Sequence, residues 1–352
     1  MSGPTAERSV VPVPAPLPEF SGLDERRIRE TVIAAGQPAV LRGLVSDWPA
    51  VRRGLESPAA LVAYLRGLDS GAPVDAIMTP PEERGRIFYN SAMSGFNYVR
   101  NRLPLSAVAE QVLRYAVFPR PPAVAAQSAL LRDCLPEFAT QNRLTLLDES
   151  VLPRIWLGNA ITTPAHFDEY SNIACAVAGR RRFTLFPPEQ IGNLYIGPLD
   201  FAPTGAPISM VSVSEPDFTR YPKFREALAH ARAAELGPGD AIFIPPTWWH
   251  YVESLAPFNV LVNYWWHAER GGQTDSAFDG LMLSILNLRR LPPETRRAWA
   301  AIYAHFVFGE EADVTGHIPP ERQGVLGRPS AERIRALRAE LASRLVKGGD
   351  PT

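Results

Sequence analysis

Residues 154–188 read RIWLGNAITTPAHFDEYSNIACAVAGRRRFTLFPP, and this stretch decides the fold. It consists of short runs of β-branched and aromatic residues that Gly, Pro and Asn interrupt. The same pattern returns in AIFIPP at 241–246 and in NVLVNYWW at 259–266. Several short strands separated by turn residues are typical of an antiparallel barrel or sandwich. The sequence therefore predicts a β-rich core over residues 154–266.

Helical patterns flank this core. On its N-terminal side Asp24 precedes ERRIRETVIAAG, Ser57-Pro58 opens AALVAYLRGL, and residues 104–117 repeat apolar side chains at helical spacing. We expect a short strand and a turn at 37–50, a loop-rich stretch at 118–153, and one helical stretch at 220–235 inside the long loop 187–238. The proline-rich segment 1–20 is expected to lie extended over the surface without forming an element of its own, and the chain is expected to be helical again after residue 272.

Composition excludes several classes of protein. The 352 residues carry a net charge of −1, with a pI near 6.6, so no basic surface is predicted for nucleic acid or for an anionic membrane. The two cysteines, Cys134 and Cys175, do not have the spacing of a zinc site or a disulfide framework. We find neither a signal peptide nor an apolar run long enough for a membrane span. These features predict a soluble, cytoplasmic protein.

The motif His166-Phe167-Asp168 is the first candidate for chemistry. Residues i and i+2 of a strand point to the same face, so His166 and Asp168 can reach one ion. His250, which ends GPGDAIFIPPTWWH, is the best candidate for a third ligand. Two histidines and one carboxylate form the facial triad of non-haem Fe(II) oxygenases. Taken singly, an H-x-D motif arises often by chance, and His250 could be a core histidine bonded to a carbonyl group.

The combined pattern TPAHFDE, GRRRFTLFPP, LGPGD, IPPTWWHYVESL and VNYWW resembles the JmjC-like cupin family of Fe(II)- and 2-oxoglutarate-dependent oxygenases. That family includes the asparaginyl hydroxylase of hypoxia-inducible factor and its bacterial relatives. The resemblance is dense over 154–266 and loose over 50–150. It implies a mainly β protein with flanking helices, whose core is a double-stranded β-helix (cupin or jelly-roll). It also implies an extended segment 1–20, an oxygenase domain 21–270, and a helical region 271–352.

The resemblance assigns the metal ligands to His166, Asp168 and His250. It also implies that further residues bind 2-oxoglutarate or line the oxygen site: Thr163, Asn172, Arg181, Asn263 and Trp265. Fe(II), 2-oxoglutarate and O2 are the implied cofactor and co-substrates.

Arg181 departs from the pattern, because the family has a lysine at this position that pairs with the far carboxylate of 2-oxoglutarate. Of the 36 basic residues only Lys223 and Lys347 are lysines, so arginine is the expected replacement. A guanidinium group can pair with a carboxylate through two hydrogen bonds, although it is longer than an ammonium group and not equivalent to it. Three alternatives follow: the pocket is reshaped to take Arg181, the co-substrate differs, or the site has decayed. The family also has a tyrosine that helps to bind 2-oxoglutarate, for which Tyr89 and Tyr98 are unranked candidates.

These features predict an oxygenase that hydroxylates a protein or peptide side chain, or a small amino-acid-like molecule. The alternative is a cupin that binds a metal without oxidation, as an isomerase, a hydrolase or a binding module. Segments 80–102 and 187–238 are expected to border the entrance. The apolar run from Phe278 to Leu288 predicts a homodimer, with burial inside one subunit as the alternative.

Overall fold

The computed structural model describes residues 11–267 and 276–347. The chain divides into two compact units, residues 1–273 and 274–352, which we describe separately. The first ten residues of the proline-rich segment lie outside the described ranges. Among the described residues no helix has the length and apolar character needed to cross a membrane.

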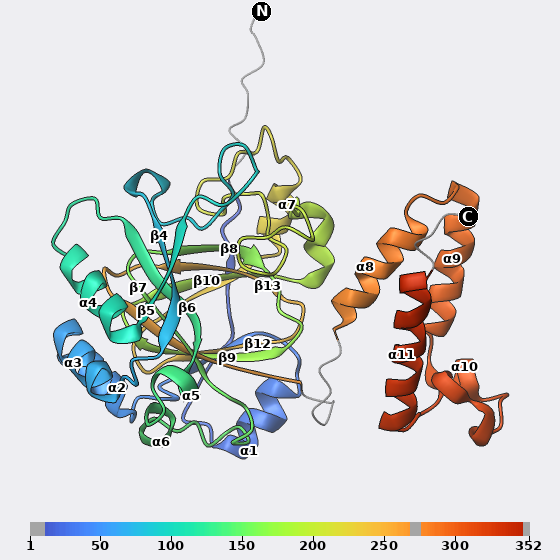
Figure 1. Ribbon diagram of the computed structural model, residues 1–352, viewed down its shortest axis with the longest axis horizontal. Coiled ribbons are helices and arrows are strands. Elements are labelled where there is room, and N and C mark those ends of the chain that lie inside the picture. Colours follow the sequence, from blue (N-terminus) through green and yellow to red (C-terminus); the bar gives the residue numbers. More distant parts are fainter. Residues whose placement is uncertain (1–10, 268–275, 348–352) are drawn as a thin grey trace, which may run out of the picture. The chain divides into compact units, whose positions relative to one another are not determined.

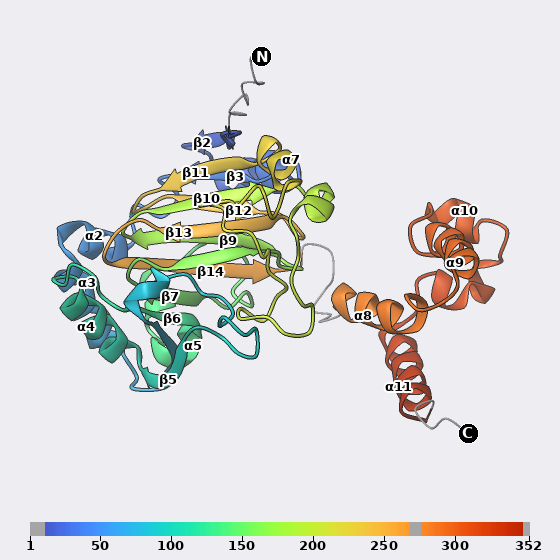
Figure 2. The same ribbon diagram turned by 90° about the horizontal axis from the view of Figure 1, so that it is seen from above.

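The N-terminal unit contains two β-sheets that face each other (Figures 1 and 2). The smaller sheet has the order β1-β11-β10-β13-β8, and the larger has the order β2-β3-β12-β9-β14-β7-β6-β4-β5. The strands of the smaller sheet are β1 (Ala15–Pro16), β8 (Thr162–His166), β10 (Arg181–Phe186), β11 (Arg232–Leu236) and β13 (Trp249–Ser254). The larger sheet has β2 (Glu19–Ser21), β3 (Ala39–Arg42), β4 (Pro73–Thr79), β5 (Val99–Pro104), β6 (Ala123–Leu130), β7 (Arg154–Gly158), β9 (Ser171–Ala178), β12 (Ala241–Ile244) and β14 (Asn259–Trp266). This is the predicted β-rich, jelly-roll type of core.

Alternation along the strands explains how the two layers form. In β9 every residue is buried, because Ile173, Cys175 and Val177 face the helical layer, whereas Ala174 and Ala176 face the smaller sheet. A strand covered on both faces is expected to read as a continuous apolar run, as SNIACAVA does. The strand therefore forms the centre of the core without a polar face.

Helices cover the outer face of the larger sheet (Figure 2). They are α1 (Glu25–Arg27) with the π-helix Ile28–Ile33, α2 (Pro49–Glu56), α3 (Pro58–Leu68), α4 (Leu105–Tyr115), α5 (Leu131–Cys134) and α6 (Phe138–Gln141). The predicted caps are present, since the Asp24 side chain accepts from the Arg27 amide and Ser57 accepts from the Ala60 amide. The short helices Pro81–Glu83, Pro188–Asn193 and α7 (Phe224–Ala229) lie in connecting segments.

Three sequence expectations were wrong in detail. The stretch 118–153 contains the eight-residue strand β6, whose alanine-rich sequence AVAAQSAL lacks the usual β-branched signal. The helical stretch 220–235 ends early, because Arg232–Leu236 pairs with β10 as strand β11. Residues 15–21 also form two short edge strands, β1 and β2, each paired in parallel with a core strand.

The C-terminal unit is helical, as expected. Its elements are α8 (Ala277–Leu288), α9 (Pro293–Phe306), α10 (Glu311–Thr315), the 3-10 turns Pro320–Arg322 and Gly324–Leu326, and α11 (Ala331–Lys347). Neither α8 nor α9 has a buried residue. Large apolar side chains are exposed on both helices, among them Leu281, Leu283, Leu286, Trp299, Ile302 and Phe306. The predicted apolar run on α8 is therefore partly exposed, and none of it is fully buried.

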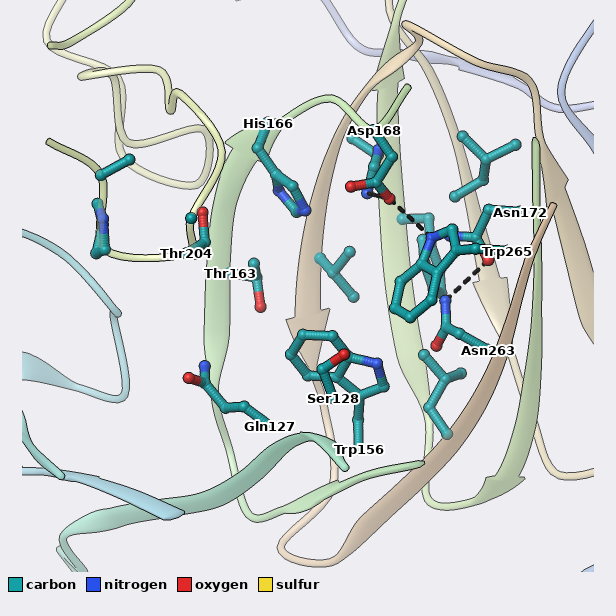
Figure 3. Close-up of a pocket in the computed structure, with 18 of the residues that line it drawn as sticks. Gln127, Ser128, Trp156, Thr163, His166, Asp168, Asn172, Thr204, Asn263 and Trp265 are labelled. Atoms are coloured by element: carbon teal, nitrogen blue, oxygen red, sulfur yellow. Dashed lines mark hydrogen bonds and ion pairs between the residues drawn. The ribbon is translucent and has the colours of Figure 1, made fainter. Parts of the chain in front are cut away.

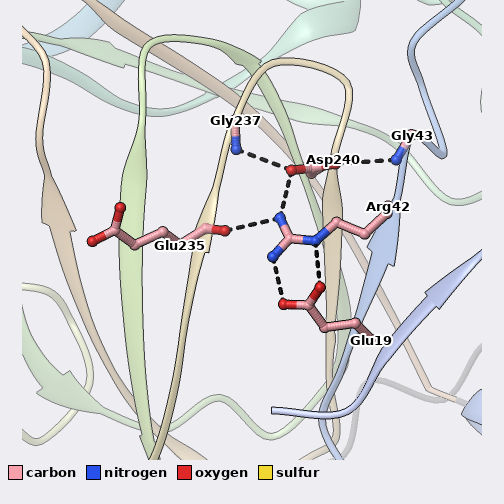
Figure 4. A network of polar contacts seen from close by, with 6 residues as sticks. All are labelled: Glu19, Arg42, Gly43, Glu235, Gly237 and Asp240. Atoms are coloured by element: carbon pink, nitrogen blue, oxygen red, sulfur yellow. Dashed lines mark hydrogen bonds and ion pairs between the residues drawn. The ribbon is translucent and has the colours of Figure 1, made fainter. Parts of the chain in front are cut away.

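A polar network joins the N-terminal segment to the core (Figure 4). Arg42, on β3, donates two hydrogen bonds to the Glu19 carboxylate, of 2.9 and 2.5 Å, and one of 2.6 Å to Asp240. Asp240 in turn accepts from the amides of Gly43 and Gly237, each at 3.1 Å. The bonds from Arg42 lower the pKa of Glu19. The network thus fixes strand β2 and the turn before β12 to the same side chain.

We predict that Arg42→Ala lowers the free energy of unfolding by about 1–2 kcal/mol, because charge-assisted bonds are lost and Asp240 keeps only its amide partners. Urea denaturation at neutral pH measures this change. Arg52→Ala is the control, because Arg52 forms an ion pair with the fully exposed Asp47 and its loss should change stability by less than about 0.5 kcal/mol. Equal effects of the two substitutions would contradict a structural role for the network.

Candidate metal and co-substrate site

The pairing of two strands brings the candidate ligands together. Strands β8 and β13 are antiparallel, with His250 directly opposite His166, and their ring centroids are 4.2 Å apart. The Asp168 Oδ2 atom lies 3.7 Å from His250 Nε2. One ligand atom from each of the three residues lies within 4.8 Å of the others. Three side chains so placed can share one ion, and their donor set suits a divalent transition metal.

Both histidines are oriented by the carbonyl two residues earlier. His166 Nδ1 lies 2.8 Å from the Pro164 oxygen, and His250 Nδ1 lies 3.1 Å from the Trp248 oxygen. A carbonyl accepts only, so each Nδ1 carries the proton and each Nε2 lone pair is available to a metal. Burial lowers the pKa of His250 to about 4, with repulsion from His166 as the second cause. His250 is therefore neutral at pH 7, the form that binds a metal ion.

Asp168 reaches the site from a turn rather than from a strand. Strand β8 ends at His166. The alternation of side chains along a strand, which we expected to place Asp168 beside His166, therefore does not position the Asp168 carboxylate. Instead the Asp168 carbonyl accepts from the Thr247 amide at 2.8 Å, and Trp265 Nε1 donates to Asp168 Oδ2 at 3.0 Å. Figure 3 shows this indole bond beside the two labelled ligands. The tryptophan therefore orients the carboxylate.

All eight predicted site residues line one cavity of about 560 Å³ between the sheets. They are Thr163, His166, Asp168, Asn172, Arg181, His250, Asn263 and Trp265. Asn263 and Trp265 share the inner face of β14, and Asn263 Nδ2 donates to Asn172 Oδ1 at 2.9 Å (Figure 3). The volume is typical of pockets that bind small molecules.

Arg181 is a buried cation for which the described part of the chain provides no anionic partner. Its side chain is on the inner face of β10, in register with Ser254 of β13, and only 9% of its surface is exposed. The Nε atom is buried and has no hydrogen-bond partner among the described residues. Burial alone lowers the pKa of Arg181 to about 10. A buried charge without a counter-ion costs several kcal/mol, so the site is suited to an anionic ligand.

The sequence motifs did not single out several other residues of the cavity wall, among them Asp75, Arg100, Gln127, Ser128 and Trp156. Four of them come from β4, β5 and β6, which no strong pattern in the sequence predicts. Trp156 lies in the predicted strand RIWLG, where period-2 alternation with the buried Ile155 and Leu157 could have shown that it faces inward.

The two candidate tyrosines form hydrogen bonds with backbone carbonyls. The Tyr89 hydroxyl donates to the Phe201 carbonyl, and the Tyr98 hydroxyl donates to the Pro203 carbonyl. Neither residue lines the cavity. Residues 202–205 and Arg100 do line it, so the two segments expected at the entrance each contribute to the cavity.

We predict that Trp265→Phe weakens divalent metal binding by about 10- to 100-fold, because Asp168 loses the bond that orients it. Calorimetric titration with Mn(II) measures the effect. Trp266→Phe is the control, because Trp266 faces the helical layer and packs against Phe243. Unchanged Mn(II) affinity in Trp265→Phe would show either that the Asp168 carboxylate is not a metal ligand or that it does not need the hydrogen bond from Trp265.

Comparison with known proteins agrees with this geometry. HSPB1-associated protein 1 of Bos taurus is 37% identical over 149 residues, which are 41% of this chain and 30% of that protein. The lysine-specific demethylase JMJ31 of Arabidopsis thaliana is 33% identical over 127 residues, covering 35% of this chain and 23% of that protein. Jumonji C domain-containing protein 5 of Drosophila melanogaster is 28% identical over 272 residues, covering 71% of this chain and 59% of that protein.

The chain thus matches less than a third of the length of HSPB1-associated protein 1. A family model, by contrast, matches most of the chain. This model is described as a cupin-like domain, and it matches residues 25–272, which include every residue that lines the cavity and all strands of the two sheets except β1 and β2. The chain therefore belongs to the cupin-like (JmjC) domain family.

Proposed function

We propose that this protein is an Fe(II)- and 2-oxoglutarate-dependent oxygenase that hydroxylates its substrate. His166, Asp168 and His250 would hold the metal. Three protein ligand atoms, which lie within 4.8 Å of one another, would leave other coordination positions for co-substrates. The bound metal would supply the oxidation, in which O2 and 2-oxoglutarate yield succinate, CO2 and one hydroxyl group on the substrate.

Arg181 is the observation that carries the proposal. A cupin that held a metal without oxidation would have no need of a buried cation in the same cavity. A dicarboxylate whose oxo-acid end faces the metal triad would place its second carboxylate at Arg181 and Thr163. The guanidinium would then gain the counter-ion that the protein itself does not provide.

The chain's own residues would prepare the site for this reaction. Asn172 and Asn263 form a bonded pair in the cavity wall, and Trp265 holds the Asp168 carboxylate. The surrounding sheets bury His250 and Arg181, so bulk water is excluded from one side of the cavity. The protein therefore positions charged groups in a dry environment, where their interactions are strong.

We propose that the substrate is a protein or peptide side chain, or an amino-acid-like molecule. Asp75 and Arg100 are exposed and line the same cavity. One acidic and one basic group at an opening fit a substrate that carries both an amine or amide and a carbonyl or carboxylate. HSPB1-associated protein 1 and the demethylase JMJ31 bear names that refer to protein partners or substrates, which favours a peptide.

We predict that Arg181→Met weakens 2-oxoglutarate binding by about 100-fold or more, while Mn(II) binding is retained, because the carboxylate loses its buried counter-ion. Calorimetry on the Mn(II)-loaded protein measures both affinities. The ligand-free variant should be at least as stable as wild type, since an uncompensated charge is removed.

Arg182→Met is the matched control for this experiment. Arg182 is the next residue on β10, faces outward and pairs with Glu235 at 2.5 Å. Its loss should leave the 2-oxoglutarate affinity unchanged. Equal affinities for the wild type and Arg181→Met would contradict the proposed role of Arg181, and wild-type protein that binds Mn(II) but no 2-oxoglutarate would contradict the proposed function.

We also propose that the C-terminal unit forms a homodimer through α8 and α9. These helices expose Leu281, Leu283 and Leu286 together with Trp299 and Ile302. An apolar surface of this kind is rare on a monomer and favours self-association.

We predict that the double substitution Leu283→Glu and Leu286→Glu converts a wild-type dimer into a monomer, because two charges would be buried in the interface. Sedimentation velocity at micromolar concentration measures the state. Leu55→Glu in α2, which is 65% exposed in the N-terminal unit, should not change it. A monomeric wild type would rule out the dimer.

A further inference from the structure

Trp156 carries the second unpaired buried donor of the cavity. Its Nε1 atom is buried and, among the described residues, has no hydrogen-bond partner. An indole N–H can only donate, and leaving it unpaired costs about 1–3 kcal/mol. Within the described residues, the unpartnered buried nitrogen atoms that line the cavity are those of Trp156 and Arg181.

The fold places these two donors around the same space. Trp156 comes from β7 in the larger sheet, and Arg181 comes from β10 in the smaller sheet. Both line the main cavity, and both also line an inner cavity of about 20 Å³, together with Thr163. A space of this size holds one water molecule. Ala125 and Gly158 also line the inner cavity. Because these residues are small, they leave space beside the N–H groups of Trp156 and Arg181.

Trp156 lies away from the metal triad but is connected to it. Figure 3 shows Trp156 at the opposite end of the cavity from His166 and Asp168, on the side of Ser128 and Gln127. Its ring packs edge-on against Trp265, with centroids 6.4 Å apart. A ligand chelated at the triad would therefore present its far end to Trp156 rather than its reacting end.

We propose that Trp156 Nε1 donates a hydrogen bond to the distal carboxylate of the 2-oxo-dicarboxylate, opposite Arg181. Trp156 is then a positioning residue: with Arg181 it selects a co-substrate that carries a second carboxylate. The pair does the work that the family resemblance assigned in part to a tyrosine, since neither Tyr89 nor Tyr98 lines the cavity and both bond to backbone carbonyls. This inference rests on the proposed function.

The test compares two ligands that differ only at the distal end. Mn(II)-loaded protein is titrated under argon with 2-oxoglutarate and with 2-oxopentanoate, which has the same oxo-acid group but no second carboxylate. Trp156→Phe should bind 2-oxoglutarate about 10-fold or more weakly than wild type, as expected for a lost bond to a charged group. Its affinity for 2-oxopentanoate should stay within about 2-fold, because that ligand never receives the bond.

A second measurement follows the Trp156 indole N–H group in the wild-type protein. The chain has seven tryptophans, so the Zn(II)-loaded protein gives few indole N–H signals in a proton–nitrogen NMR spectrum. The signal that is absent from Trp156→Phe, or from Trp156→Tyr if the phenylalanine variant does not fold, should shift downfield with 2-oxoglutarate and not with 2-oxopentanoate.

The outcomes separate this inference from the proposed function. Equal weakening for both ligands would assign Trp156 a packing role, and unchanged 2-oxoglutarate affinity would assign its N–H to a water molecule in the inner cavity. Either result overturns the inference and leaves the proposed function intact. Wild-type protein that binds metal but not 2-oxoglutarate would overturn both.

Discussion

The antiparallel pairing of β8 with β13 is the constraint on which the site depends. It places His250 opposite His166, and the shift in register after His250 brings Thr163 opposite Val252 at the cavity wall. A slip of one residue would turn one histidine out of the cavity, because side chains alternate between faces. The pairing of β13 with β10 then fixes Arg181 within the same sheet. The two candidate histidine ligands and Arg181, the proposed co-substrate anchor, are thus positioned by the strand pairings of one sheet.

The cavity retains unpaired polar groups where a structural core would pair them. Within residues 11–267 and 276–347, Arg181 and Trp156 each hold a buried donor without a partner, and Asn263 Oδ1 is also buried without one. Packed interiors satisfy nearly all such groups, so their concentration in one cavity is characteristic of a binding site. By contrast, the Arg42 guanidinium, which lies away from the cavity, donates hydrogen bonds to Glu19, to Asp240 and to the Glu235 carbonyl. The same residue type therefore stabilises the fold in one place and, in the proposed function, binds a ligand in another.

The sequence predicted the parts of the fold whose signal is local. The runs around Trp156, Ile173 and Val262 and the caps at Asp24 and Ser57 identify their own elements. Strands β6 and β11 escaped prediction, because an alanine-rich run and a helix-like run become strands only through their neighbours in the sheet. For the same reason the residues of the site could be proposed from motifs, whereas the engagement of Tyr89 and the inward position of Gln127 required the assembled sheets.

The central claim is that the His-Asp-His group and Arg181 together accept a metal and a 2-oxo-dicarboxylate. The most direct test is an anaerobic titration of wild-type protein with Fe(II) and then with 2-oxoglutarate, followed by visible absorption spectroscopy. We predict a charge-transfer band that appears only when Fe(II) and 2-oxoglutarate are both present and that saturates at one equivalent of each per chain. Fe(II) binding without such a band at saturating 2-oxoglutarate would contradict it and favour a cupin that binds a metal without oxidising a substrate.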